Sequence, residues 1–301
     1  MTGTIGAAIE DIDLRKLDDE EFAAVKQAFL HYCVVVIRDQ HLEPEAQVAF
    51  GARFGKLNMT PGTESSDPHN RQSTSAGLRG YPQVLRVRNT GKTYAYTENW
   101  HSDNCFSERP TAVSILAAQQ IPAVGGDTIF SNQYVAYETL SEGMKRMLRG
   151  LRLKHTGAAQ AVISDATGEV PAADLHRKYG GGAVATLAAK ATAEIPFSYH
   201  PVARTHPETR RRALYIGGAP SIAVPHFEGM TEQESHPLQR FLHEHSIQPD
   251  RCYRHRWQPG DVLMWDNRCT MHYAVHDYGD ATREMNRVTV EGDVPFEAPY
   301  D

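Results

Sequence analysis

Residues 253–268, YRHRWQPGDVLMWDNR, and residues 286–293, NRVTVEGD, decide the fold class. Both stretches contain the β-branched and aromatic residues that strands favour, and Pro259-Gly260-Asp261 marks a turn within the first of them. No glycine-rich phosphate-binding fingerprint follows any expected strand. We therefore predict a mainly β protein with flanking helices, of the α+β type, rather than a doubly wound parallel sheet.

Helices and further strands are expected on the N-terminal side of this β-rich end. In residues 18–32, Phe22, Val25 and Phe29 share one face of a helix. A helix over 231–246 begins with a capping-box pair, Thr231 and Glu234. The other expected elements are a helix over 43–55 and strands over 33–40, 82–87 and 125–131.

Two stretches lack the periodicity of helices and strands. Residues 58–80 are rich in serine, glycine, proline and asparagine, and we expect a long loop there. Residues 157–195 have weak periodicity and three consecutive glycines at 180–182, which predicts a mobile excursion. Because no repeat or linker divides the chain, residues 1–301 are expected to form one domain.

Composition excludes several classes of protein. The net charge is −6 and 41% of the residues are hydrophobic, as in an ordinary globular protein. The one basic run, at 210–212, is expected to be a solvated turn, so neither nucleic acid nor a membrane surface is indicated as a partner. The four cysteines have no CxxC spacing, which argues against zinc ribbons. The N-terminal residues lack a signal-peptide pattern, so we expect a cytoplasmic protein.

The segment ENWHSDNCF, residues 98–106, contains a His-x-Asp triplet, which is expected by chance in a chain with 15 histidines. In an extended segment, residues two apart point to the same side, so His101 and Asp103 can face one cavity. Two histidines and one carboxylate on one face of an octahedral metal leave three positions open for oxygen chemistry. His272, in WDNRCTMHYAV, is the best candidate for the third ligand.

Other histidines compete for that role. His243 and His245 lie on the expected polar helix and are expected to be solvated, whereas His200 and His206 flank a turn-like HPETR segment and are expected to be structural. His276 follows His272 by four residues, and either supports the metal ligands or is exposed.

Three separated motifs together resemble the taurine dioxygenase and 2,4-dichlorophenoxyacetate dioxygenase family of Fe(II)/2-oxoglutarate-dependent oxygenases. The motifs are NWHSDNCF at 99–106, PAVGGDTIFSN at 122–132, and the block from Gly260 to Phe296. Weaker similarity runs along most of the chain, in CVVVIRDQHL, FGARFGKL and HPVARTHPET. The resemblance implies a double-stranded β-helix core, a jelly roll of the cupin type, with Fe(II) as cofactor and 2-oxoglutarate and O2 as cosubstrates.

The resemblance also implies roles for individual residues. His101, Asp103 and His272 match the metal-binding triad that is required for catalysis. Arg283 and Thr128 match the pair that binds the far carboxylate of 2-oxoglutarate. A guanidinium offers a fork of donors suited to a carboxylate or a sulfonate.

Four further positions are expected to bind the primary substrate. Arg287 matches an arginine that meets the sulfonate in taurine dioxygenase, and an extended 283–287 segment would turn both arginines to one side. His69 lies in the long loop, where the family often places substrate-binding residues. Tyr96 lies close enough to His101 in sequence to line a substrate pocket, with packing in the core as the alternative. Thr97 stands where the taurine enzyme has an asparagine that touches substrate, which puts taurine itself in doubt. We expect a small organic anion: a sulfonate, a sulfate ester or an aryloxyalkanoate-like carboxylate.

Supporting residues and rival functions remain open at this point. Trp100 and Trp265 either line the site or belong to the core, and Asn99 and Asp266 either support the metal ligands or make turns. The rival functions are a metal- and 2-oxoglutarate-binding protein without catalysis, such as a sensor, and a zinc hydrolase. The sequence leaves the oligomeric state open, including a homo-oligomer.

Overall fold

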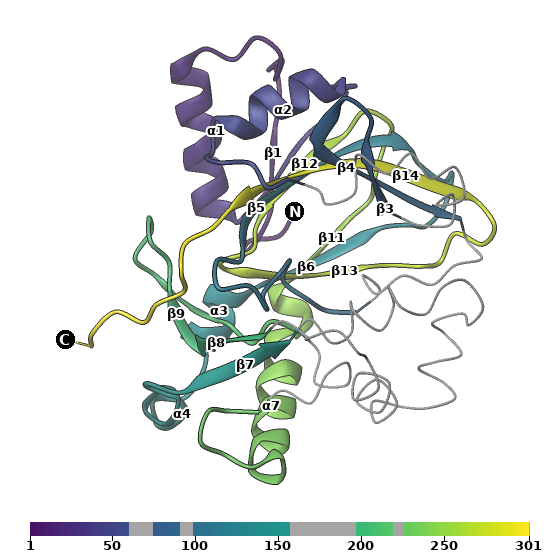
Figure 1. The fold of residues 1–301 in the computed structure, drawn as a ribbon. Helices are drawn as coiled ribbons and strands as arrows, with labels where there is room; N and C mark the ends of the chain where they lie inside the picture. The colour runs from purple at the N-terminus through teal and green to yellow at the C-terminus, as the bar shows by residue number, and fades with distance from the viewer. Residues whose placement is uncertain (60–74, 91–98, 157–196, 219–225, 301) are drawn as a thin grey trace.

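The structure, a computed structural model, describes residues 1–59, 75–90, 99–156, 197–218 and 226–300 (Figure 1). The expected excursion at 157–195 lies outside these ranges, so it stays a prediction, as does the single-domain organisation. Among the described residues, no helix combines the length and apolarity that crossing a bilayer requires.

A large sheet and a small sheet form the centre of the molecule (Figure 1). The large sheet has the strand order β1-β2-β12-β5-β14-β4-β3, and β11-β6-β13 form the small one. Apart from the parallel pair β1 and β2, neighbouring strands in both sheets are antiparallel. The large sheet consists of β1 (Ala7–Ile9), β2 (Val34–Ile37), β12 (Val262–Asp266), β5 (Thr111–Gln120), β14 (Thr282–Glu291), β4 (Tyr81–Thr90) and β3 (Ser75–Leu78). The small sheet consists of β11 (Cys252–His255), β6 (Thr128–Asn132) and β13 (Thr270–Ala274).

The remaining elements cover these sheets (Figure 1). They are the helices α1 (Asp19–Tyr32), α2 (Pro44–Ala52), α3 (Gln133–Glu138), α4 (Glu142–Leu148) and α7 (Glu232–Ser246), the 3-10 turn η2 (Pro249–Arg251), and two strand pairs, β7 (Arg152–Thr156) with β8 (Phe197–Pro201) and β9 (Ala203–Thr205) with β10 (Arg212–Leu214). The predicted capping box of Thr231 and Glu234 begins α7.

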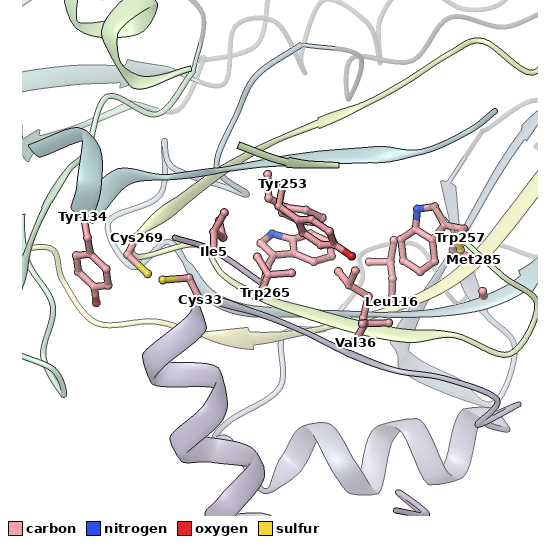
Figure 2. Packing of buried hydrophobic residues seen from close by; sticks show 14 of the residues in the cluster. Ile5, Cys33, Val36, Leu116, Tyr134, Tyr253, Trp257, Trp265, Cys269 and Met285 are labelled. Carbon is pink, nitrogen blue, oxygen red and sulfur yellow. The ribbon is translucent and has the colours of Figure 1, made fainter. Parts of the chain in front are cut away.

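Strand β2 shows how the large sheet buries both of its faces. Its four residues VVVI are all buried, and they alternate between two clusters. Val34 and Val36 face the small sheet, in a cluster with Phe130 of β6 and Trp265 of β12. Figure 2 shows Val36 and Trp265 within this cluster. Val35 and Ile37 face the helices, in a cluster that includes Phe29 of α1. Because side chains in a strand alternate between faces, a continuous apolar run is the pattern of a strand covered on both sides.

The two facing sheets with helices outside them confirm the predicted jelly-roll fold class. The strands expected at 33–40, 82–87 and 125–131 contain β2, most of β4 and β6, and the helices expected at 18–32 and 43–55 contain α1 and α2. The loop expected over 58–80 is wrong in part, because β3 occupies Ser75–Leu78 and pairs with β4. The amino-acid composition of 58–80 did not predict β3, because the formation of a strand at a sheet edge depends on pairing with its neighbour.

Histidine environments correct one expectation and confirm another. His243 and His245 are half-buried rather than solvated, and His245 bonds to the carbonyl of Ala136 through Nε2. Burial lowers the pKa of both rings. His200 and His206 are buried and structural, as expected: Nε2 of His200 donates to the Ser107 carbonyl at 2.9 Å. The solvated turn expected at 210–212 is right only in part: Arg210 is exposed and follows the turn at 207–209, whereas Arg212 lies in β10 and stacks on Tyr300.

His200 predicts how stability depends on pH. Burial lowers its pKa to about 4, although the bond to the Ser107 carbonyl acts in the opposite direction. Its ring takes up a proton in the unfolded chain below about pH 6.5 but in the folded protein only near pH 4. The free energy of unfolding should therefore fall as pH drops from 6.5 to 4, by up to about 1.4 kcal/mol per pH unit for this residue. Urea unfolding of wild type and H200Q across this window should show a shallower pH dependence in the variant. Identical slopes would contradict the assignment.

Candidate active site

The predicted triad comes together in space. One ligand atom each from His101, Asp103 and His272 lie within 4.8 Å of one another, and all three residues are buried. Asp103 Oδ1 is 3.8 Å from His101 Nε2 and 3.9 Å from His272 Nε2. Reciprocal backbone hydrogen bonds of 2.9 and 2.8 Å between His101 and His272 place the two rings side by side, with centroids 4.1 Å apart. Backbone pairing thus brings together ligands that are 171 positions apart in the numbering of the chain.

The protonation states of the triad suit a cation. Burial lowers the pKa of His101 and of His272, so both rings are neutral. Burial alone would raise the pKa of Asp103, but Arg287 and the two histidines outweigh it and hold that pKa well below its usual range. His101 Nδ1 lies 2.6 Å from the Asn99 carbonyl, which leaves Nε2 with a lone pair for a metal. Two neutral imidazoles and one carboxylate are the ligand set of mononuclear Fe(II) oxygenases.

Arg283 is a buried cation on β14, the strand that also carries Arg287, whose guanidinium contacts Asp103. The Arg283 side chain is 5% exposed, its Nε donates to the Gly126 carbonyl at 3.0 Å, and its Nη2 donates to Thr128 Oγ1 at 3.3 Å. Within the described ranges, no carboxylate pairs with it. Burial lowers the pKa of Arg283 to about 10, so the guanidinium is still charged near neutral pH. A buried cation is costly without an anion beside it, so an anionic ligand would complete this part of the site.

Thr128 is oriented from two sides. Its Oγ1 accepts from Arg283 Nη2 and from Trp257 Nε1, the latter at 3.0 Å. With both acceptor positions of the oxygen used, the hydroxyl hydrogen remains free to donate. The turn leading into β6 needs glycine, because Gly125 has a φ of +78° and a Cβ there would lie 2.4 Å from Asp277 Oδ1. The Gly-Gly-Asp-Thr motif therefore presents both Thr128 and the carbonyl that Arg283 uses.

Arg287 also points into the site. Its Nη1 lies 3.2 Å from Asp103 Oδ1, and its Nε has no hydrogen-bond partner among the described residues. Both arginines belong to the ten-residue strand β14, so the expected extended segment is confirmed. Among the described residues, the acids near Arg287 in sequence have other partners, because Glu291 pairs with Lys56 and Asp293 pairs with Arg204.

The other residues predicted for the site differ in whether the structure describes them and whether they contact the triad. His69, Tyr96 and Thr97 lie outside the described residues, so their roles stay predictions. Asn99 touches a metal ligand through its carbonyl, whereas Asp266 pairs with Arg268 and His206 away from the triad. Trp265 belongs to the core and also packs 4.7 Å from the His272 ring. Trp257, which donates to Thr128, was not predicted as a site residue, although it stands two residues before the Pro-Gly-Asp turn.

Comparisons with known proteins agree with this geometry. The family profile "Taurine catabolism dioxygenase TauD, TfdA family" matches residues 1–289. The (S)-phenoxypropionate/alpha-ketoglutarate-dioxygenase of Sphingobium herbicidovorans is 31% identical over 91% of this chain and 87% of that enzyme. The alpha-ketoglutarate-dependent sulfate ester dioxygenase of Pseudomonas putida is 30% identical over 98% of this chain and 89% of that enzyme.

A solved structure supports the fold as well. The crystal structure of a putative alpha-ketoglutarate-dependent taurine dioxygenase from Burkholderia xenovorans superimposes with a TM-score of 0.74 at 31% identity. The match covers 98% of this chain and 89% of the other. Alpha-ketoglutarate is another name for 2-oxoglutarate, the cosubstrate that the sequence motifs imply.

Removing any one triad side chain should abolish tight metal binding and leave the fold intact. H101A, D103A and H272A each remove one of three ligands, so Mn(II) affinity measured by calorimetry should fall below detection while circular dichroism stays near wild type. H236A is the matched control, because His236 is exposed on α7. Wild-type Mn(II) affinity in any of the three variants would remove that residue from the metal site.

Proposed function

The chain belongs to the TauD/TfdA family of dioxygenases, and from that premise we propose that it hydroxylates a small organic anion while 2-oxoglutarate is converted to succinate and CO2. As a member of this family it is a 2-oxoglutarate-dependent dioxygenase with Fe(II) as cofactor and O2 as cosubstrate. His101, Asp103 and His272 would hold the metal.

The observation that carries the proposal is the buried Arg283 guanidinium beside Thr128. A dicarboxylate that meets the metal at one end would bring its far carboxylate to a cation and a hydroxyl donor. Charge-assisted hydrogen bonds from a guanidinium to a carboxylate are among the stronger ones in proteins. The zinc-hydrolase alternative gives Arg283 no ligand, because hydrolysis at a metal-bound water requires no second carboxylate.

The residues of the site would position the metal and 2-oxoglutarate and shield them from bulk water, without reacting themselves. When bound, Fe(II) activates O2, one oxygen atom of which ends in succinate and the other in the hydroxylated substrate. Arg283 and Thr128 would orient 2-oxoglutarate through its far carboxylate. The triad residues are only 4–5% exposed, which keeps bulk water from a reactive centre. The difficult chemistry thus belongs to the metal and the cosubstrate, and orientation belongs to the chain.

Arg287 supports an anionic primary substrate. It projects into the same site as the triad, and within the described part of the chain its Nε has no hydrogen-bond partner. The relatives named above act on a phenoxypropionate and on sulfate esters, which are a carboxylate and a sulfate. We therefore propose that the primary substrate of this chain is a sulfonate, a sulfate ester or an aryloxyalkanoate-like carboxylate. A hydroxylated carbon that also bears oxygen or sulfur would collapse to a carbonyl group and release sulfate, sulfite or a phenol, according to the substrate.

The cellular compartment also belongs to the proposal. The four cysteines are all free thiols, which supports a reducing compartment and hence the cytoplasm.

The class of reaction is tested by incubating the Fe(II)-loaded protein with 2-oxoglutarate, O2 and a panel of sulfonates, sulfate esters and aryloxyalkanoates. At least one anion should stimulate succinate formation in step with its own oxidation. Metal and 2-oxoglutarate binding without succinate from any panel member would instead favour a sensor.

Replacing Arg283 should separate cosubstrate binding from metal binding. R283A should weaken 2-oxoglutarate binding to the Mn(II)-loaded protein about ten- to a hundredfold, since a charge-assisted hydrogen bond contributes roughly 1.5–3 kcal/mol. T128A should have a smaller effect in the same direction, and T128S, which keeps the hydroxyl, should stay near wild type. Calorimetric titration gives both affinities. Unchanged 2-oxoglutarate affinity in R283A would mean that another group holds the far carboxylate.

Arg287 should control the primary substrate instead. R287A should raise KM for the anionic substrate about tenfold or more while the KM for 2-oxoglutarate stays near wild type. The sharper comparison pairs an anionic substrate with its neutral ester or amide in the wild-type enzyme. Equal kcat/KM for the two would refute recognition of the anion by Arg287.

A further inference from the structure

Asp103 belongs to a closed ring of three hydrogen bonds that lies behind the metal site. Its backbone N–H donates to Asn267 Oδ1 at 3.1 Å. Asn267 Nδ2 donates to Ser114 Oγ at 2.9 Å. Ser114 Oγ donates to Asp103 Oδ2 at 2.5 Å and so closes the ring. Ser114 and Asn267 are fully buried, and Asp103 is 5% exposed.

The directions of these bonds follow from the chemistry of the groups. An ionised carboxylate only accepts, so the Ser114 hydroxyl must donate to Asp103. That leaves the Ser114 oxygen to accept from the amide nitrogen of Asn267. The amide oxygen of Asn267 then accepts from the Asp103 N–H and also from Trp265 Nε1, at 3.0 Å. Because each assignment fixes the next, the ring has one arrangement while Asp103 is charged.

Two central strands of the large sheet, β5 and β12, hold the residues of the ring in place. Ser114 lies in β5 and is the cross-strand partner of Trp265 in β12. Asn267 directly follows β12, and its N–H donates to the Ala112 carbonyl of β5 at 2.8 Å. The segment that carries Asp103 is thus tied to two paired central strands.

The two oxygens of Asp103 therefore have different surroundings. Oδ2 accepts the short hydrogen bond from Ser114, whereas Oδ1 accepts a longer one, 3.2 Å, from Arg287 Nη1 and is the oxygen that lies 3.8 and 3.9 Å from the two histidine Nε2 atoms. A carboxylate with both oxygens free can take two positions on a metal, whereas one with an oxygen held elsewhere presents a single ligand atom. Oxygen chemistry at such a centre needs three positions that the protein leaves open.

We propose that Ser114 and Asn267 are positioning residues that hold Asp103 as a one-oxygen metal ligand. The inference rests on the metal site of the proposed function. Partners of metal-ligating groups typically affect metal affinity or activity 10- to 100-fold. Ser114 would act by occupying Oδ2, and Asn267 by orienting both the Ser114 hydroxyl and the Asp103 backbone.

The test replaces Ser114 and measures metal binding without turnover. S114A should lower the affinity for Mn(II) about 10- to 100-fold and alter the visible spectrum of the Co(II) form, which reports coordination number. S114T keeps the hydroxyl and should restore both. The matched control is S131A: Ser131 is equally buried, donates to the Ser246 carbonyl and accepts from Gln133 Nε2, but lies outside the ring.

Each result of these metal-binding measurements either supports or overturns the role proposed for Ser114. Loss of affinity in S114A together with wild-type affinity in S131A supports the proposal, provided that circular dichroism shows both folded. Wild-type affinity and an unaltered Co(II) spectrum in folded S114A would overturn it. An equal loss in S131A would also overturn it, because the effect would then come from packing. If S114A does not fold, N267A with the same two readouts gives the decision. Failure of the wild type to bind Mn(II) would instead overturn the proposed function.

Discussion

A buried positive charge that pairs with no carboxylate of the described residues is the constraint on which the site depends. Arg283 is 5% exposed, and within the described ranges its hydrogen bonds go to a carbonyl and a hydroxyl. Replacing such a group by an apolar side chain of similar volume would be expected to stabilise the fold. In the proposed function this cation and the buried His101, Asp103 and His272 form an anion site and a metal site that one dicarboxylate joins.

The jelly roll allows this arrangement because its two sheets approach the site from different directions. His272 lies in β13 of the small sheet, whereas both arginines lie in β14 of the large sheet. Asp103 reaches the large sheet through Ser114 of β5. Strands with buried, well-packed faces hold such groups more firmly than loops can. The stability of the core and the geometry of the site therefore come from the same strand pairs.

The sequence predicted those parts of the molecule that have local signals. The valine run of β2 and the apolar face of α1 mark their elements, and the motif spacing marks His101, Asp103, His272 and Arg283. Strand β3 was missed because an edge strand is defined by its partner. The roles of Ser114 and Asn267 were missed for a similar reason: a serine in an apolar strand has no pattern of its own, and its value depends on which distant side chain lies opposite. The pairing of Arg287 with Asp103 likewise required coordinates.

The most direct test of this account is a thermodynamic cycle between Arg283 and the far carboxylate of the cosubstrate. Calorimetry on Mn(II)-loaded wild type and R283A, each with 2-oxoglutarate and with 2-oxopentanoate, gives four affinities and isolates the pairwise interaction. The account predicts a coupling free energy of about 1.5–3 kcal/mol, because 2-oxopentanoate lacks the carboxylate that Arg283 meets. A coupling of zero, with the effects of the substitution and of the missing carboxylate simply adding, would contradict the account.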